Sequence, residues 1–141
     1  MFNALFSLDL IRDAAVLDLY AGSGALGIEA LSRGAAHVTF VERDRAALRA
    51  LRANIDHLGI GDRTTVLAGD ARAMAPAVPA DVVLADPPYG FDAWPELLGA
   101  VRTDFVVAEA QQEVPAPAGW ATVRAKRYGR TWVTFLERAS E

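Results

Sequence analysis

The sequence contains no cysteine and only two histidines, His37 and His57. Without cysteine, disulfide bonds, thiolate zinc sites and catalysis by a thiol are excluded. Two histidines could hold a metal ion only with help from carboxylates, so we expect no metal. Long hydrophobic runs are also missing, which argues against a membrane-spanning segment. The N-terminus lacks the basic region that begins a signal peptide, so a cytoplasmic location is expected.

Acidic residues outnumber basic ones, 18 to 14, so the formal net charge is −4. An acidic chain does not bind nucleic acid through its overall electrostatics. The basic residues are unevenly distributed, however, and five of them gather near the C-terminus: Arg124, Lys126, Arg127, Arg130 and Arg138. These five could form a local face that contacts phosphates, or they could be the solvated surface of a terminal hairpin.

Strand-like and helix-like segments alternate along the 141 residues, a length that fits a single domain over residues 1–141. Short apolar runs predict buried strands at 14–20, 37–42, 64–68, 81–85 and 105–108. Helical spacing predicts helices at 25–33, 44–58 and 94–101. The last two strands, at 120–125 and 131–136, are predicted to form a hairpin. The alternation predicts an α/β fold, with a mostly parallel seven-stranded sheet closed by an antiparallel hairpin.

Acids or glycines lie at the C-terminal ends of four of these strands, at residues 18–24, at Glu42, at Asp70 and at residues 86–89. In open parallel sheets, ligands bind beyond the carboxyl ends of the strands, where the strand order reverses. We therefore expect these four segments to meet in one site.

The glycine-rich segment at 18–24 is compatible with two cofactors. Gly22, Gly24 and Gly27 spell the G-x-G-x-x-G pattern of dinucleotide-binding proteins, with Glu42 twenty residues after Gly22. Asp18, however, would put a carboxylate at the mouth of the loop, where it repels a pyrophosphate and attracts the ammonium of a methionine moiety. This residue favours S-adenosylmethionine, although a turn or capping role for Asp18 is the alternative.

Two further acids could hold the nucleoside part of either cofactor. Glu42 can accept hydrogen bonds from a ribose diol, and Asp70 can accept from an adenine amino group, with Ala71 offering a backbone N–H. The alternatives are an acid near the helix cap for Glu42, where Asp44 is the better cap, and a turn acid for Asp70. The predicted cofactor-binding residues are Asp18, Tyr20, Ala21, Gly22, Ser23, Gly24, Glu42, Arg43, Asp70 and Ala71.

The segment Asp86-Pro87-Pro88-Tyr89 carries the strongest indication of catalysis. An exocyclic amino group is a poor nucleophile because its lone pair is delocalised into the ring. Acceptors on its two protons free that lone pair, and the Asp86 carboxylate and the Pro87 carbonyl are suitable acceptors. The prolines fix the loop, and Tyr89 offers a face on which a flipped base can stack. A Pro-rich turn without catalytic function is the alternative.

These motifs resemble those of the RsmD-type bacterial 16S rRNA guanine-N2 methyltransferases. The resemblance rests on residues 17–30, Val41-Glu42 and Asp86–Tyr89, with residues 2–6 similar to the end of that family's first helix and Tyr128-Gly129 to its closing hairpin. It implies a Rossmann-like class I fold and S-adenosylmethionine as cofactor. It also implies methylation of guanine N2 in 16S rRNA, bound as free rRNA or in the small ribosomal subunit. A monomer without metal or membrane contact is expected.

The family's N-terminal extension, with a small β-hairpin and basic residues implicated in RNA contact, has no counterpart here. We therefore expect this chain to bind the cofactor but to methylate RNA poorly. Other amino acceptors suit the same tetrapeptide, namely adenine N6, cytosine N4 and glutamine N5. A dinucleotide-dependent oxidoreductase and a ribosome- or protein-binding module without activity also stay open.

Overall fold

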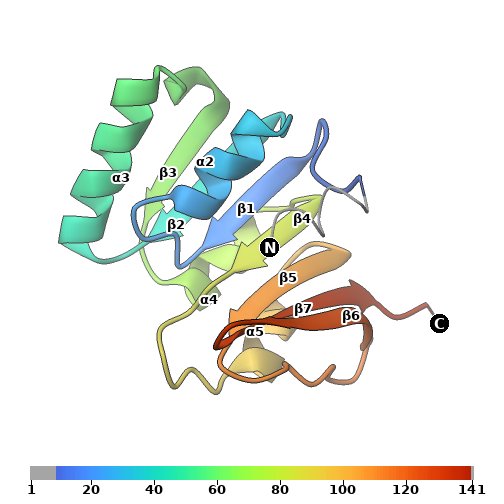
Figure 1. Cartoon of the computed structure of the whole chain (residues 1–141). Helices are drawn as coiled ribbons and strands as arrows, with labels where there is room; N and C mark the ends of the chain where they lie inside the picture. The colour runs from blue at the N-terminus through green and yellow to red at the C-terminus, as the bar shows by residue number, and fades with distance from the viewer. Residues whose placement is uncertain (1–8, 141) are drawn as a thin grey trace.

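Seven strands form one sheet at the centre of the computed structural model, which describes residues 9–140 (Figure 1). Their order is β3-β2-β1-β4-β5-β7-β6. The strands are β1 (Ala15–Leu19), β2 (His37–Glu42), β3 (Thr64–Ala68), β4 (Val82–Ala85), β5 (Phe105–Ala110), β6 (Trp120–Tyr128) and β7 (Thr131–Arg138). Strands β1 to β5 run parallel, and β7 is antiparallel to both β5 and β6. The predicted α/β fold with a closing hairpin is confirmed.

Strand order reverses at β1, which pairs with β2 on one side and with β4 on the other. This is the topological switch point, where the loops after β1 and β4 diverge and leave room for a ligand. The acid- and glycine-bearing segments predicted from the sequence therefore come to one edge of the sheet.

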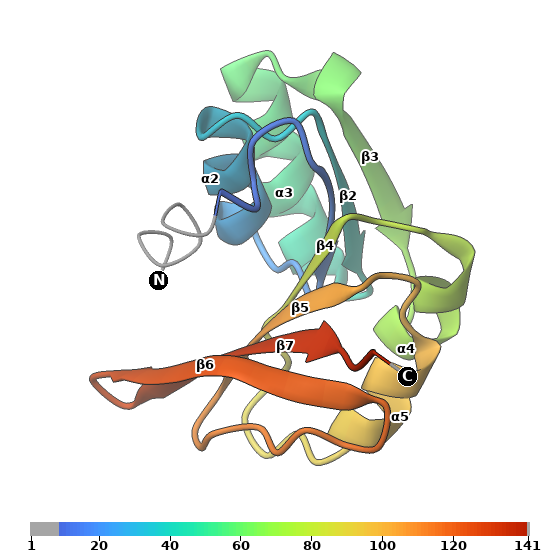
Figure 2. The same ribbon diagram turned by 90° about the vertical axis from the view of Figure 1, so that its right-hand side faces the viewer.

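Helices cover both faces of the sheet (Figures 1 and 2). On one face lie α2 (Ala25–Ser32) and α3 (Arg45–Leu58), and on the other lie α4 (Ala71–Met74) and α5 (Trp94–Ala100). Short 3-10 helices occupy Gly61–Arg63 and Ala75–Ala77. No helix in the part of the chain that the structure describes is long and apolar enough to cross a membrane.

Side chains alternate between two hydrophobic cores, as the pleat of a strand dictates. Phe40 and Leu84 face α2 and α3, where they pack with Leu51 and are buried. Leu17 and Leu98 belong to the core on the opposite face. Because both faces are covered, the central strands are nearly continuous apolar runs, which is why the sequence revealed them.

The ends of α3 follow the predicted capping chemistry. The Asp44 carboxylate accepts a hydrogen bond from the Ala47 N–H at 2.9 Å, and Gly59 ends the helix in the left-handed conformation with φ 67°. Helix α2 has no side-chain cap at Gly24, which has φ 91°.

Several differences from the predicted elements bear on the site. Helix α4 was not expected, and the hairpin strands are longer than predicted. Strand β5 continues to Ala110, two residues past the predicted end at 108, so Glu109 belongs to the strand. The segment at residues 2–6, which the resemblance places in a first helix, lies outside the described residues.

Gly27 is the position where close packing of α2 on the sheet leaves no space for a side chain. A Cβ there would meet Val38 Cγ1 at 2.8 Å and Phe40 Cζ at 2.9 Å, and both side chains are fully buried. We expect Gly27→Ala to destabilise the protein by about 1–3 kcal/mol, because neither neighbour can move into free space.

The matched control is Gly99→Ala in α5, where a Cβ would meet nothing within 4 Å. This change should be neutral or stabilising, since alanine favours helix by roughly 0.5–1 kcal/mol. Urea unfolding of both variants measures the difference, and equal stability would contradict the packing argument.

Candidate functional site

The glycine loop between β1 and α2 is held in place by its own backbone and by β2. Its Ala21 N–H donates to the Val41 carbonyl at 3.1 Å, and its Gly24 N–H donates to the Ala21 carbonyl at 2.9 Å. Tyr20 takes the left-handed conformation with φ 61°, a rare state for a non-glycine residue. The loop is thus a fixed surface beside the switch point.

Helix α3 adds a further tie to the loop. The Asn54 amide donates to the Ser23 carbonyl at 3.0 Å. Of the loop residues predicted to bind cofactor, Ser23 is exposed, Ala21 and Gly22 are partly buried, and Gly24 is buried against Leu51 and Phe40. Ala21, Gly22 and the exposed Ser23 therefore present the accessible part of the loop.

The Glu42 carboxylate organises the turn after β2. Its Oε1 accepts from the Gly22 N–H at 2.8 Å, and its Oε2 accepts from the N–H groups of Arg43 and Asp44 at 2.9 and 2.8 Å. An ionised carboxylate has about four acceptor positions. Three are already used, so Glu42 keeps room for one ribose hydroxyl while it anchors the glycine loop.

Asp18 does not lie at the open mouth of the loop, where the sequence had placed it. Its side chain is 1% exposed, and its Oδ2 accepts from the Gly27 N–H at 3.0 Å. The reason is the strand pleat, which turns Asp18 to the α2 side together with Val16. Burial raises the pKa of Asp18 well above its usual range, the Gly27 hydrogen bond lowers it, and the nearby Asp86 and Glu109 raise it further.

The position of Asp18 bears on the choice between cofactors. A pyrophosphate at a helix N-terminus uses the free N–H groups of the first turn. In α2 the Gly27 N–H is already bonded to a carboxylate. The Gly27 N–H is therefore not free to bind a dinucleotide phosphate, and the Asp18 carboxylate would repel that phosphate. Both effects favour the methionine-type cofactor.

Asp70 caps the short helix α4 and also faces Arg43. Its Oδ2 accepts from the Ala73 N–H at 3.0 Å, and its Oδ1 lies 3.8 Å from Arg43 Nη1. The sequence left open a turn role for Asp70, whereas the structure shows it as the N-cap of a helix that was not predicted. Burial, then the charge of Asp70, raises the pKa of the Tyr20 phenol, so the two side chains share one environment.

A cavity of about 340 Å³ lies at the switch point, within the range of small-ligand sites. We call it the switch-point cavity. It is lined by Tyr20, Val41, Glu42, Arg43, Asp44, Gly69, Asp70, Ala71, Asp86 and Pro88. It brings together five of the predicted cofactor residues with two of the predicted catalytic residues. Val41, Asp44 and Gly69 were not predicted, while Asp18 and residues 21–24 do not line it.

The Asp86–Tyr89 loop follows β4 directly. Pro87 is buried, whereas Tyr89 is 88% exposed. The Pro88 carbonyl accepts from the Phe91 N–H at 3.1 Å, which closes the loop as a turn. Burial raises the pKa of Asp86, so this carboxylate holds a proton more readily than a carboxylate in water.

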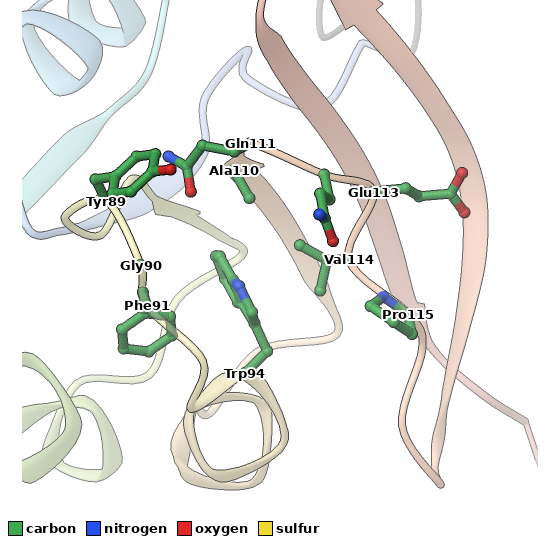
Figure 3. Close-up of a pocket in the computed structure, with 10 residues that line it drawn as sticks. Tyr89, Gly90, Phe91, Trp94, Ala110, Gln111, Glu113, Val114 and Pro115 are labelled. Carbon is green, nitrogen blue, oxygen red and sulfur yellow. The ribbon is translucent and has the colours of Figure 1, made fainter.

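A second cavity, of about 310 Å³, begins at Tyr89, the last residue of this loop (Figure 3). We call it the loop cavity. It is lined by Tyr89, Gly90, Phe91 and Trp94, by Ala110 at the end of β5, and by residues 111–115 that follow it. Apart from Tyr89, the sequence did not assign these residues to a site. Trp94 is buried in the core and also borders the cavity.

Aromatic rings connect the two cavities. The Tyr20 and Phe91 rings meet edge to face at 5.5 Å, and the Phe91 and Trp94 rings do so at 5.1 Å. Tyr20 lines the switch-point cavity and Trp94 lines the loop cavity. Tyr20, Phe91 and Trp94 therefore form a row of packed aromatic rings that runs from one cavity to the other.

Glu109 is the acid that the sequence reasoning missed. Residues Ala85 and Ala108 are paired in register, so Asp86 and Glu109 follow at the same edge of adjacent strands. Burial, then the charge of Asp86, raises the pKa of Glu109 to about 7. The strand-end rule would have found Glu109 if β5 had been predicted to run to Ala110.

The five basic residues near the C-terminus separate into two groups. Arg138 is committed to the fold, because its Nη2 donates to the Thr103 carbonyl at 2.8 Å and its guanidinium stacks 4.5 Å from the Trp120 ring. The other four stay exposed on β6 and in the turn to β7: Arg124, Lys126, Arg127 and Arg130. Within residues 9–140, no cluster of three or more acids and histidines is arranged to hold a metal.

The sequence matches one family model and is similar to known proteins. The family model described as conserved hypothetical protein 95 matches residues 1–137. The YlbH protein of Bacillus subtilis (strain 168) is 35% identical over 137 residues, which cover 86% of this chain and 74% of that protein. Ribosomal RNA small subunit methyltransferase D of Escherichia coli (strain K12) is 32% identical over an alignment 143 residues long. The alignment covers 94% of this chain and 72% of that protein.

A solved structure shares the fold throughout. The yhhF protein of Escherichia coli has a TM-score of 0.85 and 31% identity, covering 99% of this chain and 85% of that chain. The resemblance stated from the sequence motifs is thereby confirmed, and the fold is the Rossmann-like fold of class I methyltransferases. This fold and these relatives imply S-adenosylmethionine as the methyl donor.

The raised pKa of Glu109 predicts how stability depends on pH. The folded protein binds this proton more tightly than the unfolded chain, whose glutamate titrates near 4.5. The resulting stabilisation is complete below pH 4.5 and is lost as the pH rises through about 7. We expect Glu109→Gln to remove on the order of 1–3 kcal/mol of this pH-dependent change.

Urea unfolding of wild type and Glu109→Gln at pH 5, near the lower end of the titration, and at pH 8, about a unit above it, would measure the change. The control is Glu137→Gln, which alters an exposed carboxylate on β7 and should keep the wild-type pH dependence. If wild type and Glu109→Gln lost the same stability between the two pH values, the assigned environment of Glu109 would be wrong.

Proposed function

Because the chain belongs to the conserved hypothetical protein 95 family, we propose that it methylates the exocyclic N2 amino group of a guanine in 16S rRNA. The chain is an S-adenosylmethionine-dependent methyltransferase, related to enzymes that methylate ribosomal RNA. One observation carries the proposal: the Asp86–Tyr89 loop lines two cavities, each of a size for one reactant. The substrate is 16S rRNA, either free or within the small ribosomal subunit.

The switch-point cavity fits S-adenosylmethionine by its size and its set of acceptors. Glu42 has one acceptor position left for a ribose hydroxyl, and Asp70 Oδ1 is available to an adenine amino group. The Tyr20 ring lines this cavity, and the accessible part of the glycine loop would hold the methionine end beside it. When bound, S-adenosylmethionine supplies an electrophilic methyl group on a sulfonium centre.

The chain's own residues then prepare the amino group. The Asp86 carboxylate and the Pro87 carbonyl accept hydrogen bonds from the two N2–H groups. These bonds localise the nitrogen lone pair and direct it towards the methyl group. As the new N–C bond forms and the C–S bond breaks, one N2 proton must leave. Asp86 is suited to receive it, because burial raises its pKa. The buried Pro87 and the exposed Pro88 restrict the loop backbone, which keeps both acceptors oriented before the substrate arrives.

Other amino acceptors suit the same loop chemistry. Adenine N6, cytosine N4 and a glutamine amide each carry two protons on a conjugated nitrogen. The named function of the Escherichia coli relative, a small subunit rRNA methyltransferase, supports an rRNA acceptor over a protein one. The choice of guanine among the bases rests on the RsmD-type resemblance of the motifs.

Removing the Asp86 carboxylate should abolish chemistry without affecting the cofactor. We expect Asp86→Ala to lower kcat by about 100-fold or more, while the affinity for S-adenosylmethionine changes by less than about threefold. Transfer of a radiolabelled methyl group to unmethylated small ribosomal subunits gives kcat, and calorimetry gives the affinity. Asp92→Ala, an exposed acid near the same loop, is the matched control and should keep wild-type turnover. Full activity of Asp86→Ala would refute the proposed role.

Glu42 should be required for cofactor binding. We expect Glu42→Ala to weaken S-adenosylmethionine by about 10- to 100-fold, because it removes a charged acceptor and releases the Gly22 N–H. Asp56→Ala on the exposed side of α3 serves as control. Calorimetric titration with NAD should show no binding to wild type. Binding of NAD instead of S-adenosylmethionine would return the glycine loop to a dinucleotide function.

A further inference from the structure

The loop cavity has two chemically different walls (Figure 3). One wall is aromatic, made of Tyr89, Phe91 and Trp94, and the other is the segment after β5, which carries the amides of Gln111 and Gln112. The Gln111 amide is directed towards Tyr89, whereas the Glu113 carboxylate points away from the cavity (Figure 3). Within residues 9–140, no lysine or arginine lines the cavity. A flat, uncharged ligand suits this lining, and a phosphate does not.

Tyr89 is one of three large apolar side chains that are exposed among the described residues. An aromatic ring left 88% exposed beside a cavity can stack on a planar ligand and gain apolar burial. Since the cavity lies next to the Asp86–Tyr89 loop, a base stacked on Tyr89 can direct an amino group towards Asp86 and the Pro87 carbonyl. The cavity is thus placed to hold the acceptor base itself.

The position of the amino group determines what the rest of the base presents. In guanine, N1–H lies beside N2 and is followed by the O6 carbonyl, so this edge offers a donor next to an acceptor. Adenine bound through N6 offers only acceptor nitrogens beside the amino group, and cytosine bound through N4 offers the N3 acceptor. A primary amide, with one oxygen acceptor and an NH₂ donor, can pair with both guanine groups at once.

We propose that the loop cavity binds the acceptor guanine, stacked on Tyr89, and that Gln111 is a specificity-determining residue that pairs with N1–H and O6. The Gln111 oxygen accepts from N1–H, and its NH₂ group donates to O6. The inference rests on the proposed function, because it names the residue that selects the acceptor at the same site. Adenine and cytosine can form only one of these two bonds.

The test uses the full chain saturated with S-adenosylhomocysteine and labelled with nitrogen-15. Guanosine, adenosine and cytidine are titrated at millimolar concentration, and the side-chain amide signals of the glutamines are followed by NMR. We expect guanosine to shift the Gln111 amide and to bind about tenfold more tightly than the other nucleosides. Equal affinity for the three nucleosides, or no guanosine-induced shift of the Gln111 amide, would overturn the proposal.

Gln111→Met has nearly the same shape as the wild-type side chain but lacks the amide. We expect it to lower guanosine affinity and kcat/KM on unmethylated small subunits by about 10- to 100-fold, with unchanged S-adenosylmethionine affinity and thermal stability. Glu96→Gln is the control and should behave as wild type, since this exposed side chain on α5 lines neither cavity. A loss confined to Gln112→Met would overturn the assignment to Gln111.

The two proposals fail in different ways. If wild type methylates guanine N2 and Gln111→Met does so equally well, the role of Gln111 is wrong and the proposed function stands. If wild type binds S-adenosylmethionine but transfers its methyl group to a different acceptor, the proposed function fails and the guanine assignment fails with it.

Discussion

The hydrogen bond from the Gly27 N–H to the buried Asp18 carboxylate ties the first turn of α2 to the end of β1. It can form only because Gly27 has no Cβ, which lets the helix backbone approach Phe40 and Val38 on the neighbouring strand. The close approach sets the course of the glycine loop above it. A buried carboxylate is costly to desolvate, and the raised pKa of Asp18 records that cost. Here the same group both fixes the helix and occupies a donor that a phosphate would otherwise use.

Glu42 performs the corresponding task from the other side of the loop. It bonds the Gly22 N–H and two backbone groups of its own turn, so one carboxylate connects β2 with the glycine loop. The residues that shape the site are therefore also the residues that are suited to bind the ligand. Asp70 shows the same pattern, because it caps α4 and still faces the switch-point cavity.

Electrostatics at the carboxyl edge of the sheet come from three acids on adjacent strands. Asp18, Asp86 and Glu109 follow or end β1, β4 and β5, and each has a raised pKa because of burial. Mutual repulsion adds to that effect for Asp18 and Glu109. Such a site favours a carboxylate that can accept a proton. An acidic site is compatible with a nucleic-acid base, because the base itself is neutral and the charge of a nucleic acid lies on its phosphates.

The sequence alone determined the strands, the main helices and the positions of the glycine loop, Glu42 and the Asp86–Tyr89 loop. Local chemistry sufficed there, because buried parallel strands are apolar runs, caps have characteristic residues and prolines fix turns. Only the tertiary structure decided that Asp18 faces inward, that β5 extends through Glu109, and that Gln111 stands opposite Tyr89. These outcomes depend on strand pleat, register and the path of the segment after β5. Such contacts join residues that are distant in sequence, and no local pattern encodes them.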